Sequence, residues 1–81
     1  MKVRVKMFAV ARQLVEADEL ELELGEDATV AALRGKLVES HSALTTLLPH
    51  LMFAINGDYA TDETPIPYGA EVACIPPASG G

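Results

Sequence analysis

Two short stretches alternate apolar with charged residues, and this pattern constrains the fold more than any other feature of the chain. The first covers residues 2–7 with a base at every second position, and the second covers residues 19–24 with glutamates at the alternate positions. A period of two predicts β-strands with one buried and one open face. The apolar positions are Val3, Val5, Met7, Leu20, Leu22 and Leu24. Paired as a hairpin, the strands would set three bases against three acids on the open face, which helps to fix the register.

Residues 30–39 are predicted to form a helix. Val30, Leu33 and Leu37 fall on one face at helical spacing. Thr29 is suited to cap the N-terminus, with Asp27 as the competing cap. We expect the helix to lie on one face of a sheet.

The second half of the chain predicts three further strands. One helical turn precedes a strand over residues 51–55, and Asn56-Gly57 then favours a type I′ turn, because both residues tolerate positive φ. The returning strand covers residues 59–61 and is short. The apolar run over residues 72–75 predicts a central strand, buried on both faces and adjacent to the first strand.

Residues 8–15 separate the first two strands and are interpreted as a loop. Phe8 follows Met7, so it should point to the open face. There it is either covered by the loop or available to a partner protein. Arg12 is the one base in this segment, and we expect it to contact an acid on a partner.

The order strand, strand, helix, strand, strand, strand predicts an α+β fold of the ubiquitin-like β-grasp kind. In it a mixed five-stranded sheet carries one helix across one face. The sequence predicts a single domain over residues 1–75 and a flexible C-terminal tail over residues 76–81.

Composition excludes several classes of protein. The formal charge of −6 argues against nucleic acid as a partner, since phosphate binding needs Lys and Arg. No apolar run is long enough for a membrane helix, and a single cysteine offers no intramolecular disulfide and no metal cluster. We therefore expect a cytoplasmic protein with no membrane partner and no bound metal. The acids over residues 16–27 form either a solvated face or a surface that steers a basic partner.

The last six residues read Pro76-Pro77-Ala78-Ser79-Gly80-Gly81. Two prolines cannot continue a strand and favour a stiff, extended exit. At about 3.1 to 3.3 Å per residue the tail can reach roughly 19 Å from the domain. Glycine lets another backbone approach closely, so we interpret the Gly81 carboxylate as the working group.

The chain resembles the small, sulfur-carrying subunit of molybdopterin synthase, the MoaD type, along nearly its whole length. Two positions depart from the usual pattern, namely Ala70, where an aspartate is common, and Ala78, where a valine is common. The residues that carry the resemblance are Phe8-Ala9, Arg12, Thr29-Val30, Leu33, Asn56-Gly57, Gly69, Glu71-Val72 and the ending Ile75 to Gly81.

The resemblance implies a sulfur carrier in molybdenum cofactor biosynthesis. An activating enzyme of the ubiquitin-activating kind, using ATP and Mg, would adenylate Gly81, with Gly80 beside it. A sulfur-transfer protein would convert the adenylate to a thiocarboxylate. The large subunit would use this sulfur to turn cyclic pyranopterin monophosphate into molybdopterin, commonly in a heterotetramer of two small and two large subunits.

On this interpretation the isolated chain is not an enzyme and binds no cofactor. It has no nucleophile–base pair and no glycine-rich phosphate loop. The expected partner-binding residues, of which Phe8 and Ile75 correspond to family interface positions, are Phe8, Arg12, Tyr59, Ile75, Pro76, Pro77, Ala78 and Ser79.

Three other functions fit the same residues. The chain could carry sulfur for thiazole synthesis or tRNA thiolation, although thiazole carriers usually run shorter. It could be a ubiquitin-like modifier joined through Gly81 to lysines of target proteins. It could also be a β-grasp interaction module whose tail has no role.

Overall fold

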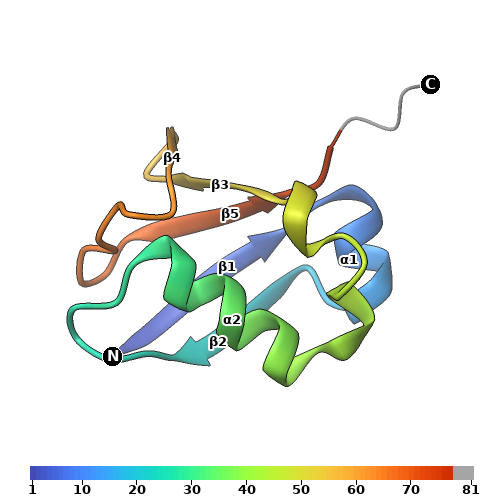
Figure 1. Cartoon of the computed structure of the whole chain (residues 1–81), viewed down its shortest axis with the longest axis horizontal. Helices are drawn as coiled ribbons and strands as arrows, with labels where there is room; N and C mark the ends of the chain where they lie inside the picture. Colours follow the sequence, from blue (N-terminus) through green and yellow to red (C-terminus); the bar gives the residue numbers. More distant parts are fainter. Residues whose placement is uncertain (78–81) are drawn as a thin grey trace.

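A computed structural model describes residues 1–77 and contains one five-stranded sheet, drawn in Figure 1. The strand order is β2-β1-β5-β3-β4; β1 and β5 are parallel and the other neighbours antiparallel. The predicted β-grasp fold is therefore confirmed. The strands are β1 (Lys2–Met7), β2 (Glu19–Glu23), β3 (Met52–Ile55), β4 (Asp58–Ala60) and β5 (Glu71–Ile75). The helices are α1 (Ala9–Val15) and α2 (Val30–Ser40), with 3-10 turns η1 (Ser42–Leu44) and η2 (Leu48–His50).

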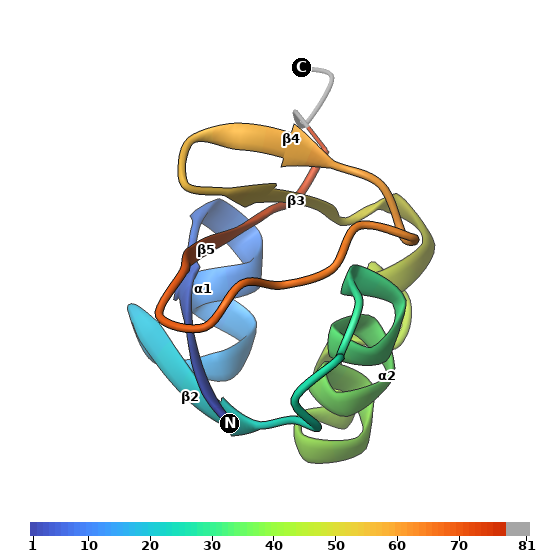
Figure 2. The ribbon, with the colours of Figure 1, turned by 90° about the vertical axis from the view of Figure 1, so that its left-hand side faces the viewer.

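Helix α2 crosses one face of the sheet, as Figures 1 and 2 show. Its N-terminus is capped as predicted, since the Thr29 hydroxyl accepts a hydrogen bond from the Ala32 N–H at 3.4 Å. Val30, Leu33 and Leu37 are fully buried against the sheet. Among the described residues no helix covers the opposite side of the sheet, which we call the open face.

The β1–β2 hairpin places its bases and acids on one face, as predicted. Lys2 faces Glu23, Arg4 faces Glu21 and Lys6 faces Glu19 on the open face, while the alternate residues of both strands point toward α2. Lys2 and Glu21 form an ion pair between the strands at 3.8 Å with both side chains largely exposed, and the Met1 ammonium, directly before β1, pairs with the exposed Glu23 carboxylate at 3.0 Å. Such exposed pairs contribute little to stability, so the buried apolar residues hold the hairpin together.

The turn after β3 also follows the prediction. Asn56 and Gly57 have φ angles of 50° and 89°, the positive pair that a type I′ turn requires. The Asn56 side-chain oxygen accepts a hydrogen bond from the Glu71 N–H at 3.0 Å. The turn therefore also fixes the point where β5 begins.

Strand β5 is central, between β1 and β3, but it is not buried on both faces as predicted. Val72 and Cys74 point toward α2 and are fully buried, whereas Ala73 and Ile75 lie half-buried on the open face. The run of apolar residues over 72–75 arises because the open face of the sheet is itself apolar at β5, and not because a second layer covers that face.

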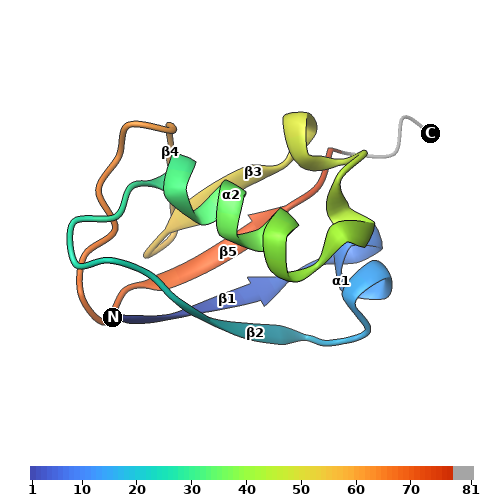
Figure 3. The same ribbon diagram turned by 60° about the horizontal axis from the view of Figure 1, so that its bottom comes forward.

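The interpretation of residues 8–15 as a loop is wrong, because residues 9–15 form helix α1. Figure 3 shows α1 at the end of the sheet where β1 and β5 both finish. Only Ala11 of this helix is fully buried, so a seven-residue helix leaves almost no periodic signal in the sequence. It ends at Glu16, whose φ of 56° is left-handed. The segment before β3 likewise has two 3-10 turns in place of the single predicted turn.

Candidate functional site

The open face of the sheet is divided into a charged half and an apolar half. The outward side chains of β1 and β2 are all charged. The outward residues of β3, β4 and the end of β5 are Met52, Ala54, Tyr59, Ala73 and Ile75. The boundary is marked by the Lys6–Glu71 ion pair at 3.0 Å, which joins β1 to the start of β5.

The apolar half contains a depression of about 420 Å³, which we call the apolar hollow. Two alanines and a glycine contribute little volume to its lining, and the other three lining side chains are larger. An exposed apolar concavity of this kind is typical of a surface that receives a partner. It is lined by Phe8, Ala54, Gly57, Tyr59, Ala73 and Ile75.

The end of β1, the middle of β4 and the end of β5 bring the larger side chains to one surface. Phe8 continues the extended backbone after β1, with φ −126° and ψ 154°, so it turns outward where Met7 turns inward. Tyr59 lies opposite Ala54 across the β3–β4 ladder, and Ile75 lies opposite Met52 across β3–β5. Residues far apart in the sequence thus share one surface.

The structure therefore unites Phe8, Tyr59 and Ile75, three of the residues expected to bind partners. Phe8 is 45% exposed and Tyr59 is 66% exposed, in contrast to the fully buried Phe53 on the other face. Of the two sequence interpretations of Phe8, coverage by its own loop does not apply. Its side chain is available on the surface of the free chain.

Arg12 does not line the apolar hollow. Its guanidinium donates to Asp18 Oδ1 at 3.2 Å, so its charge is already paired within the chain. It lies beside a smaller depression of about 290 Å³ that also involves Phe8. Any partner contact by Arg12 would compete with Asp18.

The root of the tail adjoins the hollow at Ile75. Pro76 is buried in the body of the protein and Pro77 is exposed. The Pro76 ring is thus not on the free surface, although we expected it among the partner contacts. Ala78, Ser79, Gly80 and Gly81 lie outside the described residues.

Sequence reasoning missed Met52 and the small residues in the hollow. Met52 is 50% exposed on the open face. Period-two alternation from an inward-pointing Phe53 would have placed Met52 on the open face. Ala54, Gly57 and Ala73 contribute to the hollow because their side chains are small. Small size alone does not mark a residue in the sequence as part of a binding surface.

Among residues 1–77, the clear pKa shift is that of Cys74, on the helix-covered face of the sheet. Burial raises the pKa of the Cys74 thiol from 9.0 to about 11, and the nearby Arg34 charge opposes this only in part. Cys74 therefore stays protonated near neutral pH and is a poor nucleophile. Within residues 1–77 no group of three metal-ligating side chains is close enough to hold an ion. Neither described helix is long and apolar enough to cross a bilayer.

Two sets of known proteins resemble this chain. A molybdopterin synthase sulfur carrier subunit from Chlamydomonas reinhardtii is 35% identical, and the match covers all of both chains. A protein of the same name from Arabidopsis thaliana is 31% identical over all of this chain and 84% of its own length.

Solved structures agree with these relatives. The SAMP1 structure from Haloferax volcanii superposes with a TM-score of 0.87 at 27% identity, covering all of both chains. A putative molybdopterin converting factor subunit 1 from Pyrococcus furiosus gives 0.85 at 32% identity, over 95% of this chain and 98% of that one. Residues 5–81 match the ThiS family. The chain therefore belongs to the ThiS family.

Proposed function

We propose that this chain is the sulfur carrier subunit of a molybdopterin synthase. The observation that carries the proposal is the placement of the apolar hollow beside Ile75, from which the tail ending in Gly80-Gly81 departs. A partner bound at the hollow would hold the tail at a fixed starting point. The names of relatives that match the whole chain support the same function.

The reacting atom in this proposal is at Gly81. A carboxylate is a poor electrophile, so an activating enzyme first forms the Gly81 acyl-adenylate from ATP with Mg. A persulfide on a sulfur-transfer protein then attacks the acyl carbon and displaces AMP, forming an acyl disulfide. A second thiol cleaves its S–S bond, which releases the Gly81 thiocarboxylate and leaves a disulfide on the sulfur donor. This thiocarboxylate donates its sulfur to cyclic pyranopterin monophosphate, and two loaded carriers are used for each dithiolene.

The chain supplies the sulfur and the docking surface, and its partners supply the acid–base and phosphate chemistry. The buried, protonated Cys74 is the chain's single cysteine. It is therefore poorly placed to take part in sulfur transfer. ATP and Mg belong to the activating enzyme, and on this proposal the carrier binds no cofactor or metal of its own.

Docking to the large synthase subunit rests on the apolar hollow. Phe8 and Tyr59 are exposed aromatic residues that line the same hollow, and aromatic residues of this kind often dominate interface energies. The Lys6–Glu71 and Arg12–Asp18 pairs lie near the rim, where charged contacts affect specificity more than affinity. Two small and two large subunits would form the assembly in the cytoplasm.

The net charge of −6 favours a basic partner surface. Glu19, Glu21 and Glu23 line β2, which is an edge strand. Steering by such a field raises the association rate at low salt and loses effect as salt screens it. The same charges also oppose pairing of the open strand edge with another copy.

A second candidate function is protein modification through an isopeptide bond from Gly81. It is favoured by the structural similarity to SAMP1, described in related structures as a small archaeal modifier protein. Sulfur delivery to thiazole or to tRNA is a third. Each function needs an adenylated Gly81, so the functions differ in the molecule that receives the sulfur or the Gly81 acyl group.

A reconstituted synthase reaction tests the proposal. The chain is loaded with its activating enzyme, ATP and a sulfur donor, purified, and mixed with the large subunit and cyclic pyranopterin monophosphate. We expect molybdopterin to form in proportion to the loaded chain, with two carriers consumed per product. A loaded chain that yields no product with an active large subunit would contradict the proposal. Adducts on lysines of other proteins would favour the modifier.

A further inference from the structure

The chain contains three methionines and one cysteine, and their side chains differ sharply in exposure. Cys74 is fully buried and Met7 is 2% exposed. Met1 is half-buried and packs against the core. Met52 is 50% exposed, so its thioether is the sulfur atom most accessible to a reagent in solution.

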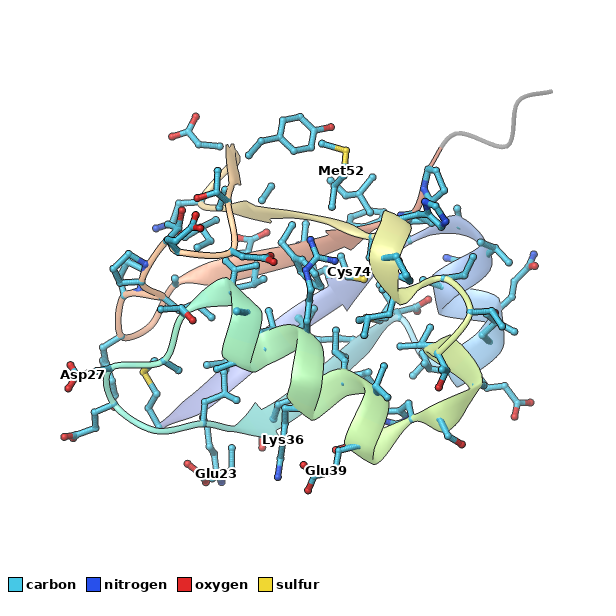
Figure 4. The ribbon with its side chains drawn as sticks, viewed as in Figure 1. Glu23, Asp27, Lys36, Glu39, Met52 and Cys74 are labelled. Carbon is cyan, nitrogen blue, oxygen red and sulfur yellow. The ribbon has the colours of Figure 1, made fainter. Side chains whose placement is uncertain are left out.

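Met52 lies on the surface assigned above to docking. Its backbone partner across the β3–β5 ladder is Ile75, which lines the apolar hollow. Ala54, two residues along the same strand, points to the same face and also lines the hollow. Figure 4 shows the Met52 side chain on the side of the sheet away from α2, whereas Cys74 lies between the sheet and the helices.

We propose that Met52 is a site of reversible oxidation by peroxides, and that its oxidation weakens docking of the carrier. The site itself follows from exposure alone, and its effect rests on the proposed function. Nothing in the carrier chemistry described above uses this side chain.

The reaction is a two-electron oxidation. A lone pair of the Met52 thioether sulfur attacks one peroxide oxygen, forming an S–O bond while the O–O bond breaks. Hydrogen peroxide gives up its other oxygen as water, and the sulfur becomes a sulfoxide. Methionine sulfoxide reductases reverse this step, so the modification can be removed.

The consequence follows from burying a polar group. A thioether is apolar and flexible and suits an adaptable contact surface, whereas a sulfoxide is polar and strongly hydrated. The outward neighbours of Met52 on β3 and β5 are Ala54 and Ile75, and neither side chain can donate a hydrogen bond to the sulfoxide oxygen. Covering this oxygen with an apolar partner surface would remove it from water without compensation from these neighbours, which we expect to weaken binding about tenfold.

Two of the other three sulfur-containing side chains are buried by the fold. Met7 and Cys74 are packed beneath the sheet, and thiol oxidation proceeds through the thiolate, which the raised pKa of Cys74 keeps scarce. The usual expectation that a lone cysteine is the redox-sensitive residue is therefore reversed in this chain.

Mild treatment of the unloaded chain with hydrogen peroxide tests the site. Cleavage after acidic residues separates the relevant sulfurs into fragments 1–16, 40–58 and 72–81. We expect the first oxygen to appear on fragment 40–58, which contains Met52. Earlier or equal oxidation of fragment 1–16 or 72–81 would overturn the assignment, whatever the protein's function.

The effect on docking is tested with the large synthase subunit. The dissociation constant is measured before and after peroxide for the natural chain and for Met52→Leu, which keeps an apolar side chain but cannot form a sulfoxide. We expect an increase of about tenfold for the natural chain, reversed by a sulfoxide reductase, and no change for Met52→Leu. Equal ratios for both chains would overturn the proposal. Failure of the untreated chain to bind would instead contradict the proposed function.

Discussion

The guanidinium of Arg34 lies 5.0 Å from the centre of the Phe53 ring, on the helix-covered side of the sheet. Its Nε also donates to Asp62 Oδ1 at 2.8 Å, and a second nitrogen donates to the Leu48 carbonyl at 2.8 Å. One side chain of α2 thus joins β3, η2 and the loop after β4. This arrangement stabilises the face of the sheet opposite the hollow.

Replacing Arg34 should therefore destabilise the fold without touching the docking surface. Arg34→Met loses the two hydrogen bonds and the contact of its charge with Phe53, and we expect a loss of about 2 kcal/mol in the free energy of unfolding in urea. Lys36→Met is the matched control on the same helix, since Lys36 makes only a 3.8 Å pair with Glu39. Equal losses for the two variants would show that the Arg34 contacts contribute nothing specific.

Replacing Gly35 should stabilise the fold. It lies on the exposed side of α2, and a Cβ built on it would meet nothing within 4 Å. Gly35→Ala should raise the free energy of unfolding by about 1 kcal/mol. Gly57 also has open space around it, but its φ is 89°, so Gly57→Ala should destabilise. A stability loss in Gly35→Ala would mean that the glycine has a role that the free chain does not reveal.

The apolar hollow predicts which substitutions impair docking. Phe8→Asp and Tyr59→Asp each place a charge beside the hollow, and we expect the affinity for the large subunit to fall at least about tenfold. Tyr68→Asp is the control, because Tyr68 is also an exposed aromatic but lies in the loop before β5 and outside the hollow. Isothermal calorimetry would measure all three. Affinities that fall equally for Tyr68→Asp would remove the hollow from the interface.

Cys74 predicts a pH dependence of stability. Its pKa is raised from 9.0 to about 11 in the folded protein, so the unfolded chain releases this proton first as the pH rises. The contribution of the protonated Cys74 thiol to the free energy of unfolding is therefore fully present below pH 9. It declines between pH 9 and 11, and the loss is about 1 kcal/mol at pH 10. Urea unfolding at pH 8 and pH 10 measures the decline.

Cys74→Ala supplies the comparison, since it removes the titrating thiol and leaves the tyrosines and lysines unchanged. The variant should be less stable at both pH values, because it loses buried sulfur. Its loss between pH 8 and pH 10 should nevertheless be smaller than that of the natural chain. An identical decline would mean that Cys74 ionises equally in the folded and unfolded states.

Most of the fold could be predicted because its signals are local and periodic. The alternation over residues 2–7 and 19–24 predicted the first hairpin, and the spacing of Val30, Leu33 and Leu37 predicted the buried face of α2. Asn56-Gly57 predicted the second hairpin from backbone conformation alone. In each case one short segment contains the whole physical reason for its structure.

The parts that could not be predicted depend on contacts between distant segments. Helix α1 is too short for a periodic pattern and buries only Ala11 completely. Whether the run around Ala73 is covered on both faces is decided by what packs over it, which its own residues do not encode. Phe8, Tyr59 and Ile75 could be proposed singly, but the hollow that joins them also needs the small side chains of Ala54 and Ala73.

The most direct test of the account is the mass of the C-terminal fragment after loading. The chain is incubated with its activating enzyme, ATP and a sulfur donor, and cleaved after Glu71 to release residues 72–81. We expect this fragment to gain the mass of one sulfur in place of one oxygen, localised at Gly81 by fragmentation. Deletion of Gly81 should abolish the gain while leaving the melting temperature almost unchanged. A fragment that keeps its carboxylate under conditions that load an authentic carrier would contradict the central claim.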